Sequence, residues 1–326
     1  MIQRSNELNA WLDERFNQYD IAPVSDDASF RRYFRVTPVG NAQRFIVMDA
    51  PPDKEDVAPF IDIAKRLRAA GLNAPQVHAR DEARGFLLLD DFADRQYLGE
   101  LNDDSVERLY GDALGALAVM QACVPSDGLP DYDETLLRAE MQLFPDWLLD
   151  RQLGLKLDDG DRRRLDSVFD LLVENALAQP RVFVHRDYHS RNLMRLEKAN
   201  PGILDFQDAV NGPLTYDLVS LLRDCYVCWP RERVVDWAWG YFDLAVQSGI
   251  LREENEKDFL RWFDLMGIQR QLKAAGIFAR LNLRDGKPGY LGDIPRTLGY
   301  IVEVAPDYPE LEAFGEWLRG RVLPRL

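Results

Sequence analysis

One segment constrains this chain more than any other. Residues 185–192 read His-Arg-Asp-Tyr-His-Ser-Arg-Asn, and Asp205 follows after a short gap. The residues just before the segment, 181–184, read Arg-Val-Phe-Val, which is typical of a short buried strand. Two more apolar runs follow at 192–196 and 202–206, and the stretch between them ends in Asn-Pro-Gly, which favours a turn. The pattern predicts a strand, a polar loop and then a β-hairpin.

The hairpin predicts which polar side chains meet. Asn192 begins its first strand and Asp205 lies near the end of its second, so antiparallel pairing brings both residues to the same end. Asp187 comes just before that end in the chain. Three oxygen-bearing side chains at one place suit a hard divalent cation that keeps several of its waters. We therefore expect Asp187, Asn192 and Asp205 to form one site.

This combination is what phosphoryl transfer requires. In kinases of the protein-kinase type, a loop Asp orients the attacking hydroxyl and accepts its proton. An Asn and a second Asp bind the magnesium ions that offset the charge of the transferring phosphate. The spacing agrees, since Asn192 stands five positions after Asp187. We predict Asp187 as the catalytic residue, Asn192 and Asp205 as Mg²⁺ ligands, and ATP as the donor.

A metallohydrolase is an alternative interpretation of the same segment. His185, Asp187 and His189 alternate along the chain, and two of the three histidines of the chain are among them. No third imidazole follows to complete a typical zinc ligand set. The kinase interpretation is therefore preferred.

Charge and composition exclude several classes of function. The net charge of −15 argues against a nucleic-acid partner, because duplex binding needs a basic surface. The sequence contains no stretch of about 20 apolar residues, so it predicts no membrane span. Residues 1–8 are polar and lack the apolar core of a signal peptide. The three cysteines, Cys123, Cys225 and Cys228, fit reduced thiols better than a disulfide framework. We expect a cytoplasmic protein and favour a monomer.

The chain changes character near residue 95, from strand patterns to apolar residues at helical spacing. The elements predicted before this point are a helix at 5–18, strands at 30–36 and 44–48, a helix at 54–70, and strands at 76–80 and 85–89. The helices predicted after it lie at 105–121, 161–178, 214–228, 231–249, 253–282 and 308–322. We predict an α+β, bilobal, protein-kinase-like fold. A small antiparallel nucleotide-binding lobe spans 1–95, with a hinge at about 87–95, and a larger helical catalytic and substrate-binding lobe spans 96–326.

Longer segments carry a family resemblance. Residues 185–192, 203–208 and 212–218 together resemble the aminoglycoside phosphotransferase and choline kinase superfamily, over nearly the whole chain. Within it, the chain looks most like the kinases that phosphorylate the anomeric hydroxyl of N-acetylmuramate and N-acetylglucosamine in cell-wall recycling. The segments behind this closer resemblance are 29–34, 45–52, 85–89, 276–280, 284–287 and 290–293. The resemblance implies transfer from ATP, with Mg²⁺, to a small-molecule sugar.

The resemblance also implies a nucleotide site in the first lobe, and this sequence departs from it twice. The expected Gly-rich loop corresponds to residues 25–32, which contain no glycine, so Ser29 and Arg32 are the predicted phosphate contacts. The lysine that holds the phosphates in most such kinases corresponds to Met48. Leu89 is predicted at the hinge, where backbone groups would pair with adenine. A nucleotide-binding pseudokinase therefore stays open as an alternative.

The remaining candidates concern the loop and the acceptor. His189 and Asp217 are expected to brace and orient the loop. The predicted substrate contacts are Arg191, Gln207, Asp208 and Arg280. Arg280 is the candidate for the lactyl carboxylate of N-acetylmuramate, because a guanidinium binds a carboxylate through two hydrogen bonds. A kinase of another small alcohol, such as an aminoglycoside or choline, is the alternative.

Overall fold

The structure is a computed structural model that describes residues 2–26, 30–40 and 43–326. The chain forms two compact units. The sheet unit comprises residues 1–100 and 192–208, and the helical unit comprises residues 101–191 and 209–326. The predicted boundary near residue 95 stays a prediction, and it did not anticipate that residues 192–208 belong with the N-terminal part. The segment 185–192 is therefore divided between the units after Arg191.

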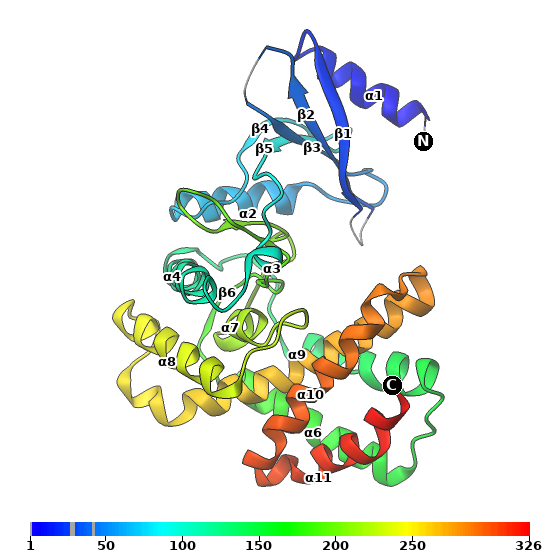
Figure 1. Cartoon of the computed structure of the whole chain (residues 1–326), viewed down its shortest axis with the longest axis vertical. Coiled ribbons are helices and arrows are strands. Elements are labelled where there is room, and N and C mark those ends of the chain that lie inside the picture. The colour runs from blue at the N-terminus through cyan, green and yellow to red at the C-terminus, as the bar shows by residue number, and fades with distance from the viewer. Residues whose placement is uncertain (1, 27–29, 41–42) are drawn as a thin grey trace. The chain divides into compact units, whose positions relative to one another are not determined.

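The sheet unit is built on one antiparallel sheet with strand order β1-β2-β3-β5-β4 (Figure 1). Its strands are β1 (Tyr19–Asp26), β2 (Arg32–Pro38), β3 (Phe45–Asp49), β4 (Val77–Asp81) and β5 (Phe86–Asp90). The predicted hairpin is confirmed by β2 and β3, and the second predicted strand pair by β4 and β5. The sequence analysis missed β1, because Pro23 and the acidic residues of this strand obscure an apolar alternation.

Three helices complete this part: α1 (Ile2–Asp13), α2 (Ala58–Ala69) and α3 (Tyr97–Glu100). An apolar stripe on α1, formed by Leu8, Trp11 and Leu12, packs against buried strand residues to form the core of the sheet unit. The two predicted helices are confirmed in type, although their ends differ by several residues. Gly71 follows α2 with φ +81°, as expected of a residue that ends a helix.

The predicted hairpin after the catalytic segment is also present, as β7 (Leu193–Met194) and β8 (Gly202–Ile203). An isolated bridge joins Gly202 to Asn73 and so ties the hairpin to the rest of the sheet unit. A side chain at Gly202 would not fit, because its Cβ would lie 2.7 Å from the ring of Phe92. The hairpin is therefore packed closely into the sheet unit.

The helical unit combines a two-stranded sheet with many helices. Strand β6 (Arg181–Val184) pairs antiparallel with β9 (Val210–Pro213). The helices are α4 (Val106–Cys123), α5 (Glu134–Met141), α6 (Asp159–Leu177), α7 (Thr215–Leu222), α8 (Arg231–Gln247), α9 (Glu256–Asp285), α10 (Ile294–Val304) and α11 (Pro309–Trp317). Short 3₁₀ turns and two π-helical segments, Phe144–Gln152 and Leu318–Val322, connect or extend them.

The predicted helices of this part are confirmed, with two kinds of difference. The helix predicted at 214–228 ends at Leu222, because residues 223–230 form a loop. The short helices α5 and α10 and the π-helix at Phe144–Gln152 were not predicted. Prolines near the starts of α10 and the π-helix, and the short length of α5, weaken the helical signal.

Helix α9 is the centre of the helical unit and packs against α6, α7, α10 and the π-helix at Phe144–Gln152 (Figure 1). Gly276 permits the closest of these approaches, since a Cβ there would lie 2.4 Å from the Leu143 backbone. Unusually for a central helix, α9 buries Asp264, Arg270 and Lys273. These charges belong to the site described below.

The α+β fold class is confirmed: a small antiparallel sheet with few helices is joined to a larger, mainly helical part. Within the described ranges, no helix combines the length and the apolar character that crossing a membrane requires.

Candidate active site

The predicted catalytic loop, residues 185–191, follows strand β6 and is held at its start by Asp217 of α7. The Asp217 carboxylate accepts hydrogen bonds from the backbone amides of His185 (2.6 Å) and Arg186 (2.9 Å). Arg186 has φ +78°, a left-handed conformation that is uncommon for residues other than glycine. Two hydrogen bonds to one buried carboxyl group thus hold a strained turn, and the geometry fits the orienting role predicted for Asp217.

A second buried carboxylate, which the sequence analysis missed, holds the end of the loop. Asp224 accepts hydrogen bonds from the amide (2.9 Å) and the hydroxyl (2.5 Å) of Ser190, and from the amide of Tyr226 (2.9 Å). Asp224 lies two residues beyond α7, the helix that carries Asp217. Consecutive segments therefore fix both ends of the loop that contains Asp187.

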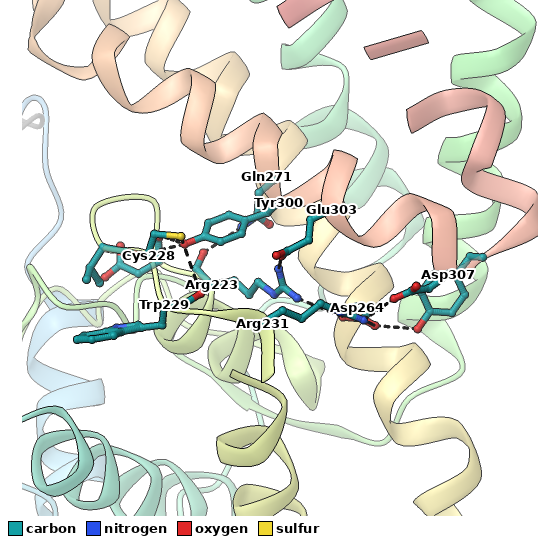
Figure 2. Close-up of polar contacts among 12 residues, drawn as sticks. Arg223, Cys228, Trp229, Arg231, Asp264, Gln271, Tyr300, Glu303 and Asp307 are labelled. Carbon is teal, nitrogen blue, oxygen red and sulfur yellow. Dashed lines mark hydrogen bonds and ion pairs between the residues drawn. The ribbon is translucent and has the colours of Figure 1, made fainter. Parts of the chain in front are cut away.

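The segment after α7, residues 223–230, is held in turn by α9 and α10 (Figure 2). The Tyr300 hydroxyl donates to the carbonyl oxygens of Asp224 (3.3 Å) and Val227 (3.0 Å). The Gln271 side chain donates to the carbonyl of Arg223 (2.9 Å). Because its own carbonyls are bound by side chains of two helices, the segment has little freedom to move away from the loop.

Ion pairs fix both ends of this segment (Figure 2). Arg223 lies 2.9 Å from Glu303 of α10. Arg231 lies 3.0 Å from Asp264 of α9 and 2.7 Å from Asp307. The position of Asp224 therefore depends on the packing of α9 and α10.

The Arg186 side chain belongs to a buried cluster of charged residues. Arg186 binds Glu140 of α5, and Lys273 of α9 lies 3.0 Å from the same carboxylate. The Tyr132 hydroxyl donates to Glu140, and Lys273 donates to the Tyr216 hydroxyl (2.8 Å). The sequence analysis did not single out Glu140 or Lys273. The available signal was a charged residue on the otherwise apolar face of a helix.

Asp187 is held in its ionised form. Burial raises the pKa of its carboxyl, but the charges of Lys273, His189 and Arg270 outweigh this and hold the pKa below its usual range. Burial lowers the pKa of His189. Arg270 is buried, and no carboxylate among the described residues pairs with it; its guanidinium donates to the Cys225 sulfur at 3.8 Å. An ionised Asp187 is what a proton acceptor requires.

In the sheet unit, Asn192 and Asp205 meet at one end of the β7–β8 hairpin, as predicted. The Asn192 Nδ2 lies 3.4 Å from Oδ2 of Asp205. The Leu204 amide donates to the Asn192 carbonyl (2.9 Å), and the Gln207 side chain donates to Asp205 (2.8 Å). Asp205 has φ +62°, so its backbone is in the left-handed region too. Neighbours within the sheet unit therefore fix this pair.

The pair fits a magnesium ion chemically. Asn192 and Asp205 offer amide and carboxylate oxygens, and both are only partly buried. Magnesium in nucleotide sites takes one or two such ligands, and phosphates and waters supply the rest. Across the ranges that the structure describes, no group of three or more His, Cys, Asp and Glu side chains gathers as a metal site. That finding gives the metallohydrolase alternative no ligand cluster.

The predicted phosphate contacts have different surroundings. Ser29 lies outside the described residues. Arg32 binds the buried carboxylate of Asp49, which also pairs with a second arginine. Arg31 lies 3.7 Å from Glu55. The role of Arg32 at phosphates stays a prediction, and it would compete with Asp49.

The other predicted contacts are distributed over both units. Leu89 lies in β5 between β3 and β4, so the sheet surrounds its backbone, and its role at adenine stays a prediction. In the sheet unit, Gln207 donates to Asp205, and Asp208 is exposed. In the helical unit, Arg191 lies over two tyrosine rings, and the buried Nε of Arg280 has no hydrogen-bond partner among the described residues.

Known proteins share both the sequence and the fold. Two proteins named N-acetylmuramate/N-acetylglucosamine kinase, from Pseudomonas putida and Pseudomonas aeruginosa, are each 46% identical to this chain. The matches cover 96% and 97% of this chain, and 95% and 96% of the two relatives. A solved structure of Plasmodium vivax ethanolamine kinase superposes with a TM-score of 0.64 at 10% identity, covering 91% of this chain and 84% of that chain, and so supports the fold alone.

The sequence profile described as the phosphotransferase enzyme family matches residues 20–249. This range includes the catalytic loop, the Asn192–Asp205 pair and Asp217. With the two bacterial relatives, it establishes the family: the chain belongs to the phosphotransferase enzyme family.

Proposed function

We propose that this enzyme transfers the γ-phosphoryl group of ATP to the anomeric hydroxyl of N-acetylmuramate or N-acetylglucosamine, giving the sugar 1-phosphate. The observation that carries the proposal is the 46% identity, over nearly the full length of both chains, to relatives named as kinases of these two sugars. Release of such sugars from the cell wall would supply the substrate, so the reaction belongs to peptidoglycan recycling. We place the enzyme in the cytoplasm, as a monomer.

Asp187 would act on the acceptor. Its carboxylate accepts a hydrogen bond from the anomeric hydroxyl, aims the oxygen at the phosphorus and takes the proton as the new bond forms. An anomeric hydroxyl is more acidic than an ordinary alcohol, so a carboxylate with a low pKa is basic enough to help. The anchors at Asp217 and Asp224 support this role, because an orienting group gains from a loop that does not move.

Asn192 and Asp205 would hold magnesium with the phosphates. A bound Mg²⁺ offsets the negative charge on the transferring group. The protein's part is to present two oxygen ligands at a fixed separation, which the hydrogen bonds from Leu204 and Gln207 support. The proposed nucleotide contacts are Ser29, Arg32 and Leu89, and Arg31 is a further cation in the same stretch of chain.

The test is ATP consumption by the purified enzyme with N-acetylmuramate, N-acetylglucosamine, an aminoglycoside, choline or no acceptor. We expect sugar-dependent turnover, and a product whose phosphorus NMR signal shows coupling to the proton at carbon 1. Turnover with another alcohol alone would replace the proposed acceptor. ATP binding without any turnover would instead support a pseudokinase.

A further inference from the structure

Arg191, the last residue of the catalytic loop, is a cation that has no acid partner in the described part of the chain. Its guanidinium carbon lies 4.7 Å from the centre of the Tyr226 ring and 5.5 Å from that of the Tyr290 ring. No carboxylate of the described residues forms an ion pair with it, whereas Arg186 of the same loop binds Glu140. The Arg191 side chain is only partly buried. A partly accessible cation without an ion pair, four positions after Asp187 in the same loop, invites an anionic group of a ligand.

The two rings that hold Arg191 are themselves fixed. Tyr290 stacks on Phe278 of α9, with ring centres 5.6 Å apart and planes 16° apart. Tyr226 contacts the same Phe278 ring at 6.2 Å and the edge of His189 at 5.5 Å. Tyr226 also lies in the 223–230 segment, which α9 and α10 hold by its carbonyls (Figure 2). Because stacking on tyrosine fixes the plane of a guanidinium, Arg191 is oriented before any ligand arrives.

The two proposed acceptors differ in the group that such a cation would bind. N-acetylmuramate carries a lactyl carboxylate on the oxygen of carbon 3, and N-acetylglucosamine has a neutral hydroxyl there. A fixed, planar guanidinium can bind a carboxylate through two parallel hydrogen bonds. Asp187 and Arg191 belong to one loop, anchored at both ends by Asp217 and Asp224. One loop could thus present a base to carbon 1 and a cation to the substituent on carbon 3.

We propose that Arg191, held between Tyr226 and Tyr290, binds the lactyl carboxylate of N-acetylmuramate and sets the preference for this sugar over N-acetylglucosamine. The inference rests on the proposed function. It moves the carboxylate contact from Arg280, the residue predicted from sequence, to Arg191. Asp285, the acid that interacts with Arg280, already pairs with Arg284 at 2.8 Å, and among the described residues no aromatic ring lies against the Arg280 guanidinium.

The test compares kcat/KM for the two sugars at saturating ATP and magnesium. We expect Arg191→Gln to lower the ratio of N-acetylmuramate to N-acetylglucosamine activity by roughly 10- to 100-fold, the range for losing a hydrogen-bonded charge. Most of that loss should lie in KM for N-acetylmuramate. Arg191→Lys keeps the charge but not the two-fold hydrogen bonding, so its ratio should fall less. Arg163→Gln, at an exposed position of α6, is the charge-matched control and should leave the ratio unchanged.

The rings provide an independent measurement. Tyr290→Phe keeps the aromatic face and should keep most of the selectivity, whereas Tyr290→Leu removes it and should shift the ratio in the same direction as Arg191→Gln. Thermal unfolding of every variant separates a loss of binding from a loss of fold. Selectivity that falls in both Arg191→Gln and Tyr290→Leu, with both proteins folded, would support the proposal.

Four results would overturn it. Equal losses for both sugars in Arg191→Gln would assign Arg191 to loop geometry. A raised KM for ATP, measured with N-acetylglucosamine as the acceptor, would assign it to phosphate. A selectivity change in Arg280→Gln but not in Arg191→Gln would return the carboxylate to Arg280. Wild-type turnover with N-acetylglucosamine alone would refute only this inference, whereas no turnover with either sugar would refute the proposed function as well.

Discussion

The two halves of the segment 185–205 differ in the residues that hold them in place. Up to Arg191 the chain lies in the helical unit, where buried acids and cations from α5, α7 and α9 hold the loop. From Asn192 it lies in the sheet unit, where the Asp205 carboxylate and the Asn192 amide meet at the end of a short hairpin and Gln207 donates to Asp205. Side chains of the protein hold the loop, whereas the Asn192–Asp205 pair presents oxygen atoms that can bind a metal ion.

This difference indicates where each half is sensitive. The position and ionisation of Asp187 depend on the residues that hold its loop. Substitutions of those residues should therefore alter Asp187, even where they lie away from the reacting atoms. A pair of metal ligands depends on its own side chains and on the ion it binds. Magnesium concentration should therefore change the loss of activity caused by substitutions at the Asn192–Asp205 pair. The pH should change the loss caused by substitutions around Asp187.

The largest effect is expected at Asp205. Asp205→Ala removes the only carboxylate of the pair and should reduce kcat by roughly 10³-fold or more, because the charge on the transferring phosphate is no longer offset. Asn192→Ala should be milder and should respond to added magnesium. Turnover measured across a magnesium titration checks both. Asp53→Ala, at an exposed position of the sheet unit, is the control; retained phosphoryl transfer by a folded Asp205→Ala protein would refute the metal role.

A smaller effect is expected at Asp187, because the loose transition state needs little proton removal. Asp187→Asn keeps the shape of the side chain but removes its charge, and should lower kcat by about 10²- to 10⁴-fold. The KM for ATP should change little, since the loop anchors are untouched. Steady-state kinetics with both substrates varied gives the measurement. A large rise in KM with unchanged kcat would mean that Asp187 binds substrate and does no chemistry.

Much of this arrangement follows from local sequence. The strand, turn and hairpin around Asp187, Asn192 and Asp205 were predictable because turn residues and apolar alternation act over a few neighbours. The pairing of β6 with β9 was not, since it joins strands across an intervening hairpin. The place of residues 192–208 in the sheet unit depends equally on long-range packing, such as the bridge from Gly202 to Asn73.

The supporting residues were harder to predict than the ligands. Glu140, Asp224 and Lys273 lie far apart in sequence and have no spacing rule, and each acquires its meaning only from a partner on another element. Arg32 illustrates the converse. Its sequence position suggested a phosphate contact, but the fold gives it a buried carboxylate at Asp49. Charge pairs of this kind depend on which side chains the fold brings together, which local patterns do not encode.

The third prediction tests whether the buried charges of the helical unit set the pKa of Asp187. Lys273→Met removes one cation from the buried cluster and should cost about 3 kcal/mol of stability, because Glu140 loses a buried partner. It also removes the largest charge that lowers the pKa of Asp187. The acid limb of the kcat/KM profile should therefore move to higher pH, since the base now protonates earlier as pH falls.

The matched control for this prediction is on the same helix. Lys257→Met replaces an exposed lysine of α9 and should change neither stability nor the pH profile. Urea unfolding and a kcat/KM profile that extends below pH 4 give the two measurements. Lost stability with an unmoved acid limb would confine Lys273 to a structural part in the cluster.

The smallest effect concerns the ionisation of Asp217. Burial raises the pKa of its carboxyl to about 7, against the opposing effect of hydrogen bonds from His185 and Arg186. A raised pKa means that the folded protein holds a proton that the unfolded chain has already released. Stability from this group is therefore present at low pH and is lost as pH rises from about 4 towards 7.

Asp217→Asn removes this titration. The advantage of the wild type over the variant in unfolding free energy should shrink by about 2–3 kcal/mol between pH 5 and pH 8. Asp243→Asn, at an exposed position of α8, should show no such slope. Urea unfolding at the two pH values decides the matter. A constant advantage would mean that the two amide hydrogen bonds outweigh burial and keep Asp217 ionised. The loop would then be held by a permanent charge, and the stability of its anchor would not depend on pH in this range.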